Sequence, residues 1–475
     1  MIGIQHTSKT GSANYERFIS HYPQFEDTAI LDELRQTDYS RLDEQEQVYL
    51  DFTGGNLYAL RQIEKHHKLL KDHIFGNPHS SNPTSMLATR LVEEAREYVL
   101  KYFRAEEDYI CIFTANASGA LKIVGESYPF DSNAHFLLTF DNHNSVNGIR
   151  EFAKHKGAGL TYCGLNINDL RVNEEEVFEK LGAFPGKKNK LFAFPAQSNV
   201  SGVKYLLDWI EYAHMNGWDV LLDAAAFVPS DRLDLSVYKP DFVSASFYKI
   251  FGYPTGLGCL LVRKEAWPKL QKPWFAGGTV TLASVIADNH FLDNSHAKFE
   301  DGTINYLDIP AIKIGLEYID SIGIETIKKR VLSLTGWLLE ELPKIRHSNG
   351  NPVVQIFGPK DLKQRGGTII MNFFDADGIA YPFEDVENKA NSLDISIRTG
   401  CFCNPGIDEV NNCLSSQELA NYFHSHETGN YYDMIAAIGK MRGAVRISIG
   451  LISNFADIDT FINFVRSFTD KSARD

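Results

Sequence analysis

The stretch that decides the fold runs from residue 241 to residue 256 and reads DFVSASFYKIFGYPTG. A strand-like run from Asp241 to Ser246 is followed at once by Lys249, which stands among aromatic and apolar residues. Such surroundings desolvate an ammonium group, lower its pKa and allow the lysine to form a Schiff base with a carbonyl compound. The alternative is an ordinary surface lysine whose stem lies along apolar side chains. The segments on both sides help to decide between these interpretations.

Outward from this stretch, short apolar runs alternate with stretches of helical period between about residues 86 and 265. This alternation predicts an α/β fold with a mostly parallel sheet and helices on both faces. The predicted strands are 109–114, 135–140, 191–194, 219–222, 241–246 and 257–262, and the predicted helices are 83–102 and 206–216. Gly217 stands where a left-handed residue would end the second helix.

The chain of 475 residues is too long for one hydrophobic core, because single cores stop growing near ~250–300 residues. After about residue 300, helical patterns at 311–322 and 324–342 precede strand-like runs at 367–373 and 444–449. This order of helical and strand-like patterns is typical of a smaller α+β domain. We therefore predict a large domain over residues 46–300 and a small domain formed by residues 1–45 and 301–475.

The composition excludes several classes of protein. With 61 acidic against 47 basic residues the formal charge is −14, which would repel nucleic acid and an anionic membrane surface. Six cysteines are too few for a disulfide framework, and neither a signal-peptide core near the N-terminus nor a run of 18 apolar residues occurs. The sequence predicts a soluble cytoplasmic protein that binds neither nucleic acid nor membranes.

Polar residues follow the ends of the predicted strands, where the binding crevice of an open α/β sheet lies. Ala117 and Ser118 belong to a turn of small residues that leaves backbone N–H groups open at a helix start, which suits a phosphate group. His143, Asn199 and Asp223 each follow another strand. Taken singly, Ser118 and Asp223 could be helix caps and His143 a core histidine.

Taken together, these residues point to one cofactor. A lysine, an aspartate and a phosphate-binding turn at the ends of three strands are the three anchors of pyridoxal phosphate. Lys249 would hold its aldehyde carbon, Asp223 its pyridine nitrogen, and the turn at Ala117 and Ser118 its phosphate. The sequence predicts pyridoxal 5′-phosphate as the cofactor.

At this level of detail the chain resembles the class V aminotransferase family, over about residues 51–454. The motifs that carry the resemblance lie at residues 75–80 (FGNPHS), 194–199 (FPAQSN), 222–227 (LDAAAF), 246–258, 299–303 (FEDGT) and 398–406 (RTGCFCNPG). Within the family the chain is most similar to the cysteine desulfurase-like N-terminal part of molybdenum cofactor sulfurases. The resemblance implies the aspartate aminotransferase-like fold, type I of the pyridoxal phosphate enzymes, and a homodimer.

The resemblance also implies roles for single residues. It supports Lys249 and Asp223 as above and places His143 against the face of the cofactor ring. Asn199 would bond the phenolic oxygen of the cofactor or the substrate, and Ser246 would join Ala117 and Ser118 at the phosphate.

Three further residues are assigned by motif alone. Thr279 would reach a phosphate across the dimer interface, and Arg446 would bind the carboxylate of the substrate, a task suited to its planar fork. Cys403 lies where desulfurases carry the cysteine that accepts sulfur as a thiolate. The implied activity is removal of sulfur, or selenium, from L-cysteine or a related amino acid. Its products are alanine and a persulfide on Cys403, and a sulfur-acceptor protein is a candidate partner.

Three alternatives stay open. The same cofactor could serve an aminotransferase or a C–S lyase in which the cysteine has no role. A non-catalytic scaffold is conceivable, but the intact lysine, aspartate, histidine and arginine count against it. Zinc is the third alternative, but the spacing of its candidate ligands does not match common zinc motifs, so no metal site is predicted. Those candidates are Cys401, Cys403, Cys413, His424 and His426.

Overall fold

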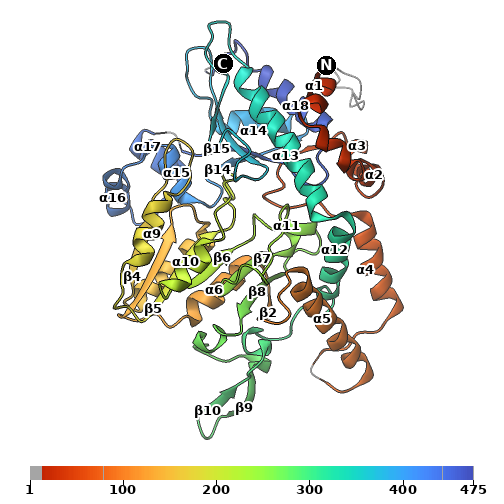
Figure 1. The fold of residues 1–475 in the computed structure, drawn as a ribbon, viewed down its shortest axis with the longest axis vertical. Coiled ribbons are helices and arrows are strands. Elements are labelled where there is room, and N and C mark those ends of the chain that lie inside the picture. Colours follow the sequence, from red (N-terminus) through yellow and green to blue (C-terminus); the bar gives the residue numbers. More distant parts are fainter. Residues whose placement is uncertain (1–12, 79, 441, 474–475) are drawn as a thin grey trace.

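The computed structural model describes residues 13–78, 80–440 and 442–473. His79, from the motif at residues 75–80, and the first twelve residues of the predicted small domain lie outside this part of the chain. Figure 1 shows a large sheet in the middle of the molecule and a small sheet above it.

The large sheet has seven strands in the order β2-β8-β7-β6-β5-β3-β4. Its neighbouring strands run parallel except around β8, which is antiparallel to both β2 and β7. The strands are β2 (Tyr109–Thr114), β3 (Ala134–Thr139), β4 (Gly159–Cys163), β5 (Asn189–Pro195), β6 (Asp219–Asp223), β7 (Phe242–Ser246) and β8 (Gly258–Arg263). All six strands predicted for this sheet are confirmed to within two residues at each end, and β4 is its one strand that was not predicted.

Alternate side chains of the central strands face two different layers of helices. Phe192 and Leu222 belong to the core shared with α5 (Pro83–Tyr102), α9 (Glu174–Gly182) and α10 (Trp209–Met215). Ala193 and Leu221 belong to the core shared with α6 (Ala117–Ser127) and α8 (Ile149–His155). Burial on both faces explains why these strands are almost wholly apolar. Helix α10 is shorter than predicted, and Gly217 beyond it has the expected left-handed backbone, with φ of 72°.

The small sheet is antiparallel, in the order β11-β12-β15-β14. Its strands are β11 (Val354–Phe357), β12 (Thr368–Phe373), β14 (Arg398–Gly400) and β15 (Ala444–Ser448). The helices of this part are α12 (Ile309–Ile322), α13 (Ile324–Glu341), α14 (Phe383–Asn391) and α18 (Phe455–Arg466). Strand β1 (Val48–Tyr49) pairs in parallel with β13 (Ile395–Ser396), so the N-terminal segment joins the C-terminal part of the chain. The division into two domains stays a prediction.

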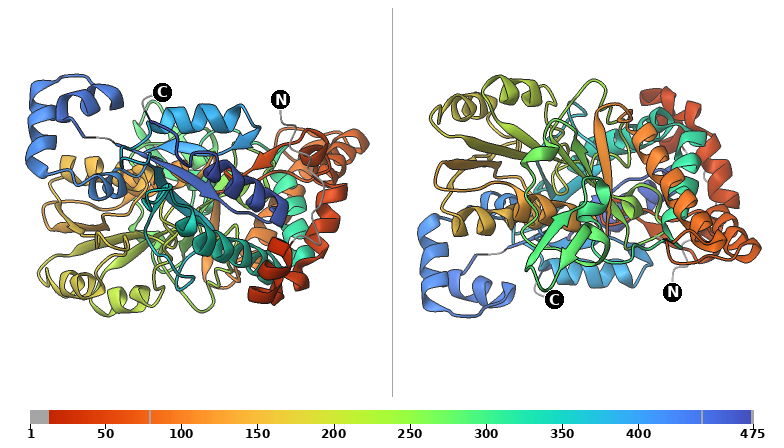
Figure 2. Two further views of the ribbon diagram at one scale, coloured as in Figure 1. Left: turned by 90° about the horizontal axis from the view of Figure 1, so that it is seen from above. Right: turned by 90° about the horizontal axis from the view of Figure 1, so that it is seen from below.

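Further helices lie outside the groups named above. They are α1 (Ala13–His21), α2 (Ile30–Thr37), α3 (Arg41–Glu44), α4 (Leu60–Asp72), α7 (Asn144–Asn147), α11 (Phe247–Phe251), α15 (Pro405–Asn411), α16 (Ser416–Ser425) and α17 (Tyr431–Ile438). Figure 2 shows the blue helices α15–α17 and the red N-terminal helices at opposite ends of the molecule. A hairpin of β9 (Val280–Ser284) and β10 (Asn289–Leu292) projects from the body (Figure 1). None of the helices in the described part combines the length and apolar composition needed to span a bilayer.

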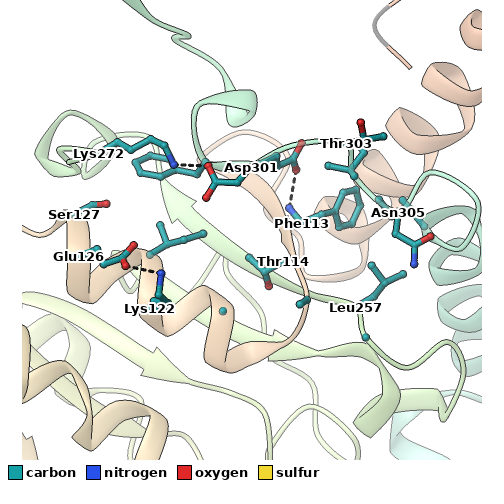
Figure 3. A pocket seen from close by; sticks show the side chains of 18 residues that line it. Phe113, Thr114, Lys122, Glu126, Ser127, Leu257, Lys272, Asp301, Thr303 and Asn305 are labelled. Carbon is teal, nitrogen blue, oxygen red and sulfur yellow. Dashed lines mark hydrogen bonds and ion pairs between the residues drawn. The ribbon is translucent and has the colours of Figure 1, made fainter. Parts of the chain in front are cut away.

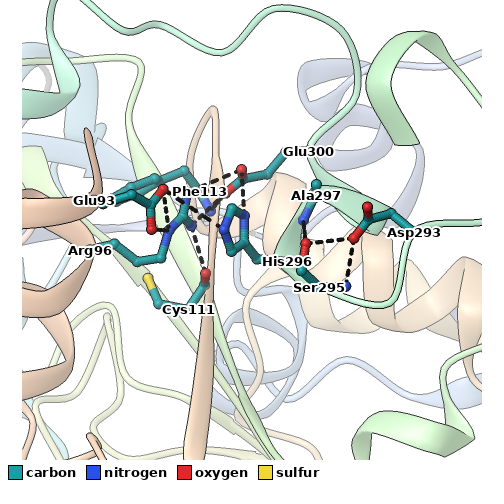
Figure 4. A network of polar contacts seen from close by, with 9 residues as sticks. All are labelled: Glu93, Arg96, Cys111, Phe113, Asp293, Ser295, His296, Ala297 and Glu300. Carbon is teal, nitrogen blue, oxygen red and sulfur yellow. Dashed lines mark hydrogen bonds and ion pairs between the residues drawn. The ribbon is translucent and has the colours of Figure 1, made fainter. Parts of the chain in front are cut away.

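A buried ion pair fixes the motif at residues 299–303 against α5 and β2 (Figure 4). Arg96 donates to Glu300 at 2.7 Å and to the carbonyl oxygen of Cys111, and Glu300 accepts the backbone N–H of Phe113. Burial alone would raise the pKa of Glu300. The hydrogen bond with His296 and the charge of Arg96 outweigh burial and lower the pKa to about 2. Glu300 is thus ionised and links its own motif to α5 and β2.

Candidate active site

A cavity of about 280 Å³ lies at the carboxyl ends of β3, β5, β6 and β7. This is where the crevice of an open α/β sheet is expected. Seven of the ten predicted site residues line it, namely Ala117, Ser118, His143, Asn199, Asp223, Ser246 and Lys249. Arg446, Cys403 and Thr279 do not line it.

Lys249 lies in α11, one turn after the end of β7. Burial lowers the pKa of its ammonium group, the charge of Asp223 opposes this, and the charge of Arg446 reinforces it. Within the described residues its Nζ atom has no hydrogen-bond partner. The amine therefore lies in the cavity, and its lowered pKa favours the neutral form that attacks a carbonyl carbon.

Asp223 ends β6 and is 9% exposed. The backbone N–H of Ala225 (3.1 Å) and the hydroxyl of Ser244 (3.2 Å) both donate to its Oδ1 atom. Among the described residues no donor reaches Oδ2, so this oxygen is available to a protonated nitrogen in the cavity. No helix follows Asp223, since residues 225–230 form turns, so the bond to Ala225 belongs to a turn and the helix-cap interpretation of Asp223 is wrong.

His143 both caps a helix and lines the cavity. Its Nδ1 atom accepts the backbone N–H of Ser145 at 3.1 Å and so caps α7. This bond leaves the proton of the neutral imidazole on Nε2. Burial lowers the pKa of His143, and the charge of Asp223 opposes this while Lys249 reinforces it. A neutral, oriented ring in the cavity wall suits stacking on another ring.

The N-terminus of α6 provides an anion-binding end of the cavity. Asn116, not Ser118, caps the helix by accepting the N–H of Gly119. The N–H of Ala117 donates to the hydroxyl of Ser246 at 2.8 Å, and the hydroxyls of Ser118 and Ser145 lie 2.6 Å apart. A side chain at Gly258 would come within 2.6 Å of the backbone of Asn116, so only glycine lets β8 approach this turn.

One buried acceptor in the cavity has no partner. Gln197 is 4% exposed, lines the cavity, and its Oε1 atom finds no donor within the described residues. A polar ligand would satisfy it, because a buried unpaired acceptor is costly. A nucleophilic lysine, a carboxylate, a neutral imidazole and a helix N-terminus around one cavity fit pyridoxal phosphate.

Arg446 lies in β15 and is buried next to this cavity, where it faces Asp51. Its Nη2 atom donates to Asp51 at 2.8 Å and its Nη1 atom to the carbonyl oxygen of Asn199 at 2.9 Å. Arg398 binds the other oxygen of Asp51 at 2.6 Å. Sequence reasoning named Arg398 only as part of the motif at residues 398–406 and gave Asp51 no role, because Asp51 and Arg446 lie 395 positions apart along the chain.

Cys403 lies in a loop, residues 401–404, that we call the Cys loop. The backbone N–H of Asn144, next to His143, donates to the carbonyl oxygen of Cys403 at 2.7 Å. The amide of Asn199 donates to the carbonyl oxygen of Phe402 at 2.8 Å, and the Phe402 ring lies 4.9 Å from the Arg446 guanidinium carbon. The structure therefore brings the Cys loop against residues that line the cavity, with the Cys403 side chain exposed.

Thr279 is the predicted site residue that the structure keeps apart from the others. It is buried at the start of the projecting hairpin, and its hydroxyl accepts the N–H of Ala276 at 2.9 Å. Its predicted contact across a dimer interface involves a second chain and stays a prediction.

Two other cavities suit the cofactor less well. One of about 370 Å³ contains Lys122 and Lys272, but Glu126 and Asp301 neutralise them at 2.5 and 2.6 Å (Figure 3). A larger one of about 640 Å³, between α5 and the base of the hairpin, is lined by no lysine. No group of three His, Cys, Asp or Glu side chains suited to a metal ion occurs in the part of the chain that the structure describes.

Comparison with known proteins agrees with this geometry. Residues 48–461 match the model of the aminotransferase class-V family. The chain is 37% identical to a molybdenum cofactor sulfurase of Solanum lycopersicum and 36% identical to one of Homo sapiens, over 95% and 92% of its own length. It spans only 59% and 51% of those two relatives.

Solved structures confirm the predicted fold type. A cysteine desulfurase of Thermococcus onnurineus superposes with a TM-score of 0.75 at 23% identity, over 92% of this chain and 97% of that one. A cysteine desulfurase of Escherichia coli superposes with a TM-score of 0.68 at 20% identity, over 89% and 95% of the two chains. With the family match over most of its length, the chain belongs to the aminotransferase class-V family.

Proposed function

We propose that this protein is a pyridoxal phosphate enzyme that removes sulfur, or selenium, from L-cysteine or a related amino acid. One observation carries the proposal. The cavity contains a nucleophilic lysine, a carboxylate and an anion-binding helix end. The backbone of the Cys loop, which carries an exposed cysteine, is hydrogen-bonded beside this cavity. A transaminase needs the cavity but not the cysteine.

The cofactor, when bound, would supply an electron sink for bonds broken at the amino acid. Lys249 would hold it and then move protons at the substrate's α-carbon and β-carbon. Asp223 would keep the pyridine nitrogen protonated, His143 would pack on the ring, and the N-terminus of α6 would hold the phosphate. Asn199 would orient the substrate.

Arg446 would bind the carboxylate of the amino acid. Its Nε atom is buried and has no partner within the described residues, while Asp51 and Asn199 occupy its other nitrogens. A carboxylate would satisfy Nε and compete with Asp51 for the guanidinium group. Arg398 would then keep Asp51 from being left as an unpaired charge.

Cys403 would act as a thiolate that attacks the sulfur of the substrate. An S–S bond forms, the C–S bond of the amino acid breaks, and the carbon skeleton takes up a proton and leaves as alanine. The sum is cysteine plus an enzyme thiol giving alanine plus an enzyme persulfide, so no external oxidant or reductant is needed. An exposed Cys403 can then pass sulfur to an acceptor protein, which is the partner we propose.

Six free cysteines fit a reducing compartment, and we place the reaction in the cytoplasm.

A substrate panel tests this function. Purified protein loaded with cofactor is incubated with L-cysteine, L-selenocysteine, L-cystine, L-alanine and L-aspartate, while alanine, sulfide or selenide, pyruvate and other keto acids are measured. We expect alanine and sulfur in equal amounts from cysteine, and no keto acid. Pyruvate with sulfide would identify a C–S lyase, a keto acid without sulfide a transaminase, and no product a scaffold.

We also propose that the enzyme is a homodimer in which the hairpin of β9 and β10 meets a second copy. Val285 and Ile286 at its tip are 98% and 101% exposed, which is unusual for adjacent apolar residues on a monomer. The double variant Val285→Lys, Ile286→Lys is expected to shift the protein from dimer to monomer in light scattering coupled to size exclusion. Met215→Lys, at an exposed apolar residue of α10, is the matched control and should stay dimeric. A dimeric hairpin variant would contradict this role of the hairpin.

A further inference from the structure

The Cys loop has an uncommon backbone. Phe402 and Cys403 have φ of 56° and 54°, so two consecutive residues with side chains lie in the left-handed region. Such residues keep this conformation only where surrounding contacts hold them. The two carbonyl oxygens are held by the Asn199 amide and the Asn144 N–H, as described above.

The third contact of the loop leads into the protein. The side-chain amide of Asn404 donates to Asp141 Oδ1 at 2.6 Å and to the side-chain Oδ1 of Asn199 at 3.1 Å. The Asn199 amide, which donates to Phe402 in turn, is thus oriented by the same residue. One asparagine therefore links the strained loop, a residue of the cavity wall and a buried carboxylate.

Asp141 is fully buried, two residues before His143. Ser198 and Tyr205 also donate to it, at 3.0 and 2.6 Å, and no cation contacts it among the described residues. Burial raises its pKa, and the hydrogen bonds from Tyr205, Asn404 and Ser198 oppose the rise. A carboxyl group that accepts three donors has a strong preference for keeping each of them, because a lost bond leaves a buried oxygen unpaired.

We propose that Asp141 is a positioning residue that acts through Asn404: it holds the Cys loop in its left-handed conformation and thereby keeps Cys403 beside the cavity. Its catalytic consequence rests on the proposed function, since it concerns the rate at which Cys403 takes up sulfur. The structural part does not, because it concerns the loop alone.

Two variants break the link from opposite ends. Asn404→Ser keeps an oxygen that can cap α15, as Asn404 does through Ile407, but is too short to reach Asp141. Asp141→Asn presents an amide where three donors converge. Tyr205→Phe is the matched control, since it removes a bond to Asp141 Oδ2 and leaves the contact with Asn404.

Hydrogen exchange of the peptide covering residues 399–407 is measured by mass spectrometry, without substrate. We expect exchange about tenfold faster or more in Asn404→Ser and Asp141→Asn, and little change in Tyr205→Phe. A single turnover at saturating L-cysteine should form the Cys403 persulfide about tenfold more slowly in both variants, with the cofactor absorbance kept.

Unchanged exchange in both variants would overturn the positioning role. Faster exchange with an unchanged persulfide rate would overturn its catalytic part. If the unmodified protein forms no persulfide while the variants exchange faster, the proposed function fails and the link between Asp141 and the Cys loop stands.

Discussion

Lys249→Ala is expected to abolish turnover and to remove the borohydride-sensitive absorbance of the holoenzyme. The amine is the nucleophile that would bind the cofactor, and also the group that would move protons at the substrate. Proton transfer by a positioned side chain alone contributes roughly 10²–10⁴-fold, so we expect activity to fall by about 10³-fold or more. Because burial lowers the pKa of Lys249, its neutral form should be available at lower pH than for an exposed lysine.

The control for this variant is a lysine in the neighbouring cavity. Lys272→Ala removes an amine that is held by Asp301 and should keep both the absorbance and the activity. Borohydride reduction followed by peptide mapping should place the cofactor on the peptide that contains Lys249. A cofactor found on Lys272, or bleachable absorbance kept in Lys249→Ala, would show that the wrong cavity has been assigned.

The large sheet could be predicted from sequence because its strands are buried on both faces and so form apolar runs. Strand β4 was not predicted because it is an edge strand, and four of its five residues are only partly buried. Helices α16 and α17 were not predicted either, since they lie at one end of the molecule and bury few residues, Tyr422 and Met434 among them. In these three elements few residues are buried, so the apolar periodicity that predicts a strand or helix is weak.

Some residues of the candidate site could likewise be predicted from sequence, and others could not. Lys249 and His143 each follow a strand and Asp223 ends one, so the rule that ligands bind at the carboxyl ends of strands finds them from a single sequence. The same rule does not find the partners of Asp51 and Asp141. These partners, Arg446 and Asn404, lie 395 and 263 positions away along the chain, and only the tertiary fold brings each pair together.

Cys403→Ser is expected to stop the formation of alanine and of protein-bound persulfide from cysteine, while the cofactor absorbance stays intact. A serine hydroxyl cannot take up sulfur as a thiolate does, because at neutral pH it is not ionised and it forms no persulfide. The expected loss is complete within detection, since the thiol is a reactant and not only a catalyst. Mass spectrometry of the unmodified protein should find one added sulfur atom on Cys403 after a single turnover.

Cys401→Ser is the matched control, two residues away in the same loop. Burial raises the pKa of Cys401, which disfavours the thiolate there, and its side chain is less exposed than that of Cys403. We expect this variant to keep most of the activity and to form the persulfide on Cys403. Full activity in Cys403→Ser would make the cysteine a bystander and favour a transaminase or C–S lyase, since those reactions need only Lys249 as proton carrier and Arg446 as carboxylate ligand. Activity lost in Cys401→Ser alone would instead move the acceptor role by two residues, to a thiol that the fold keeps half-buried.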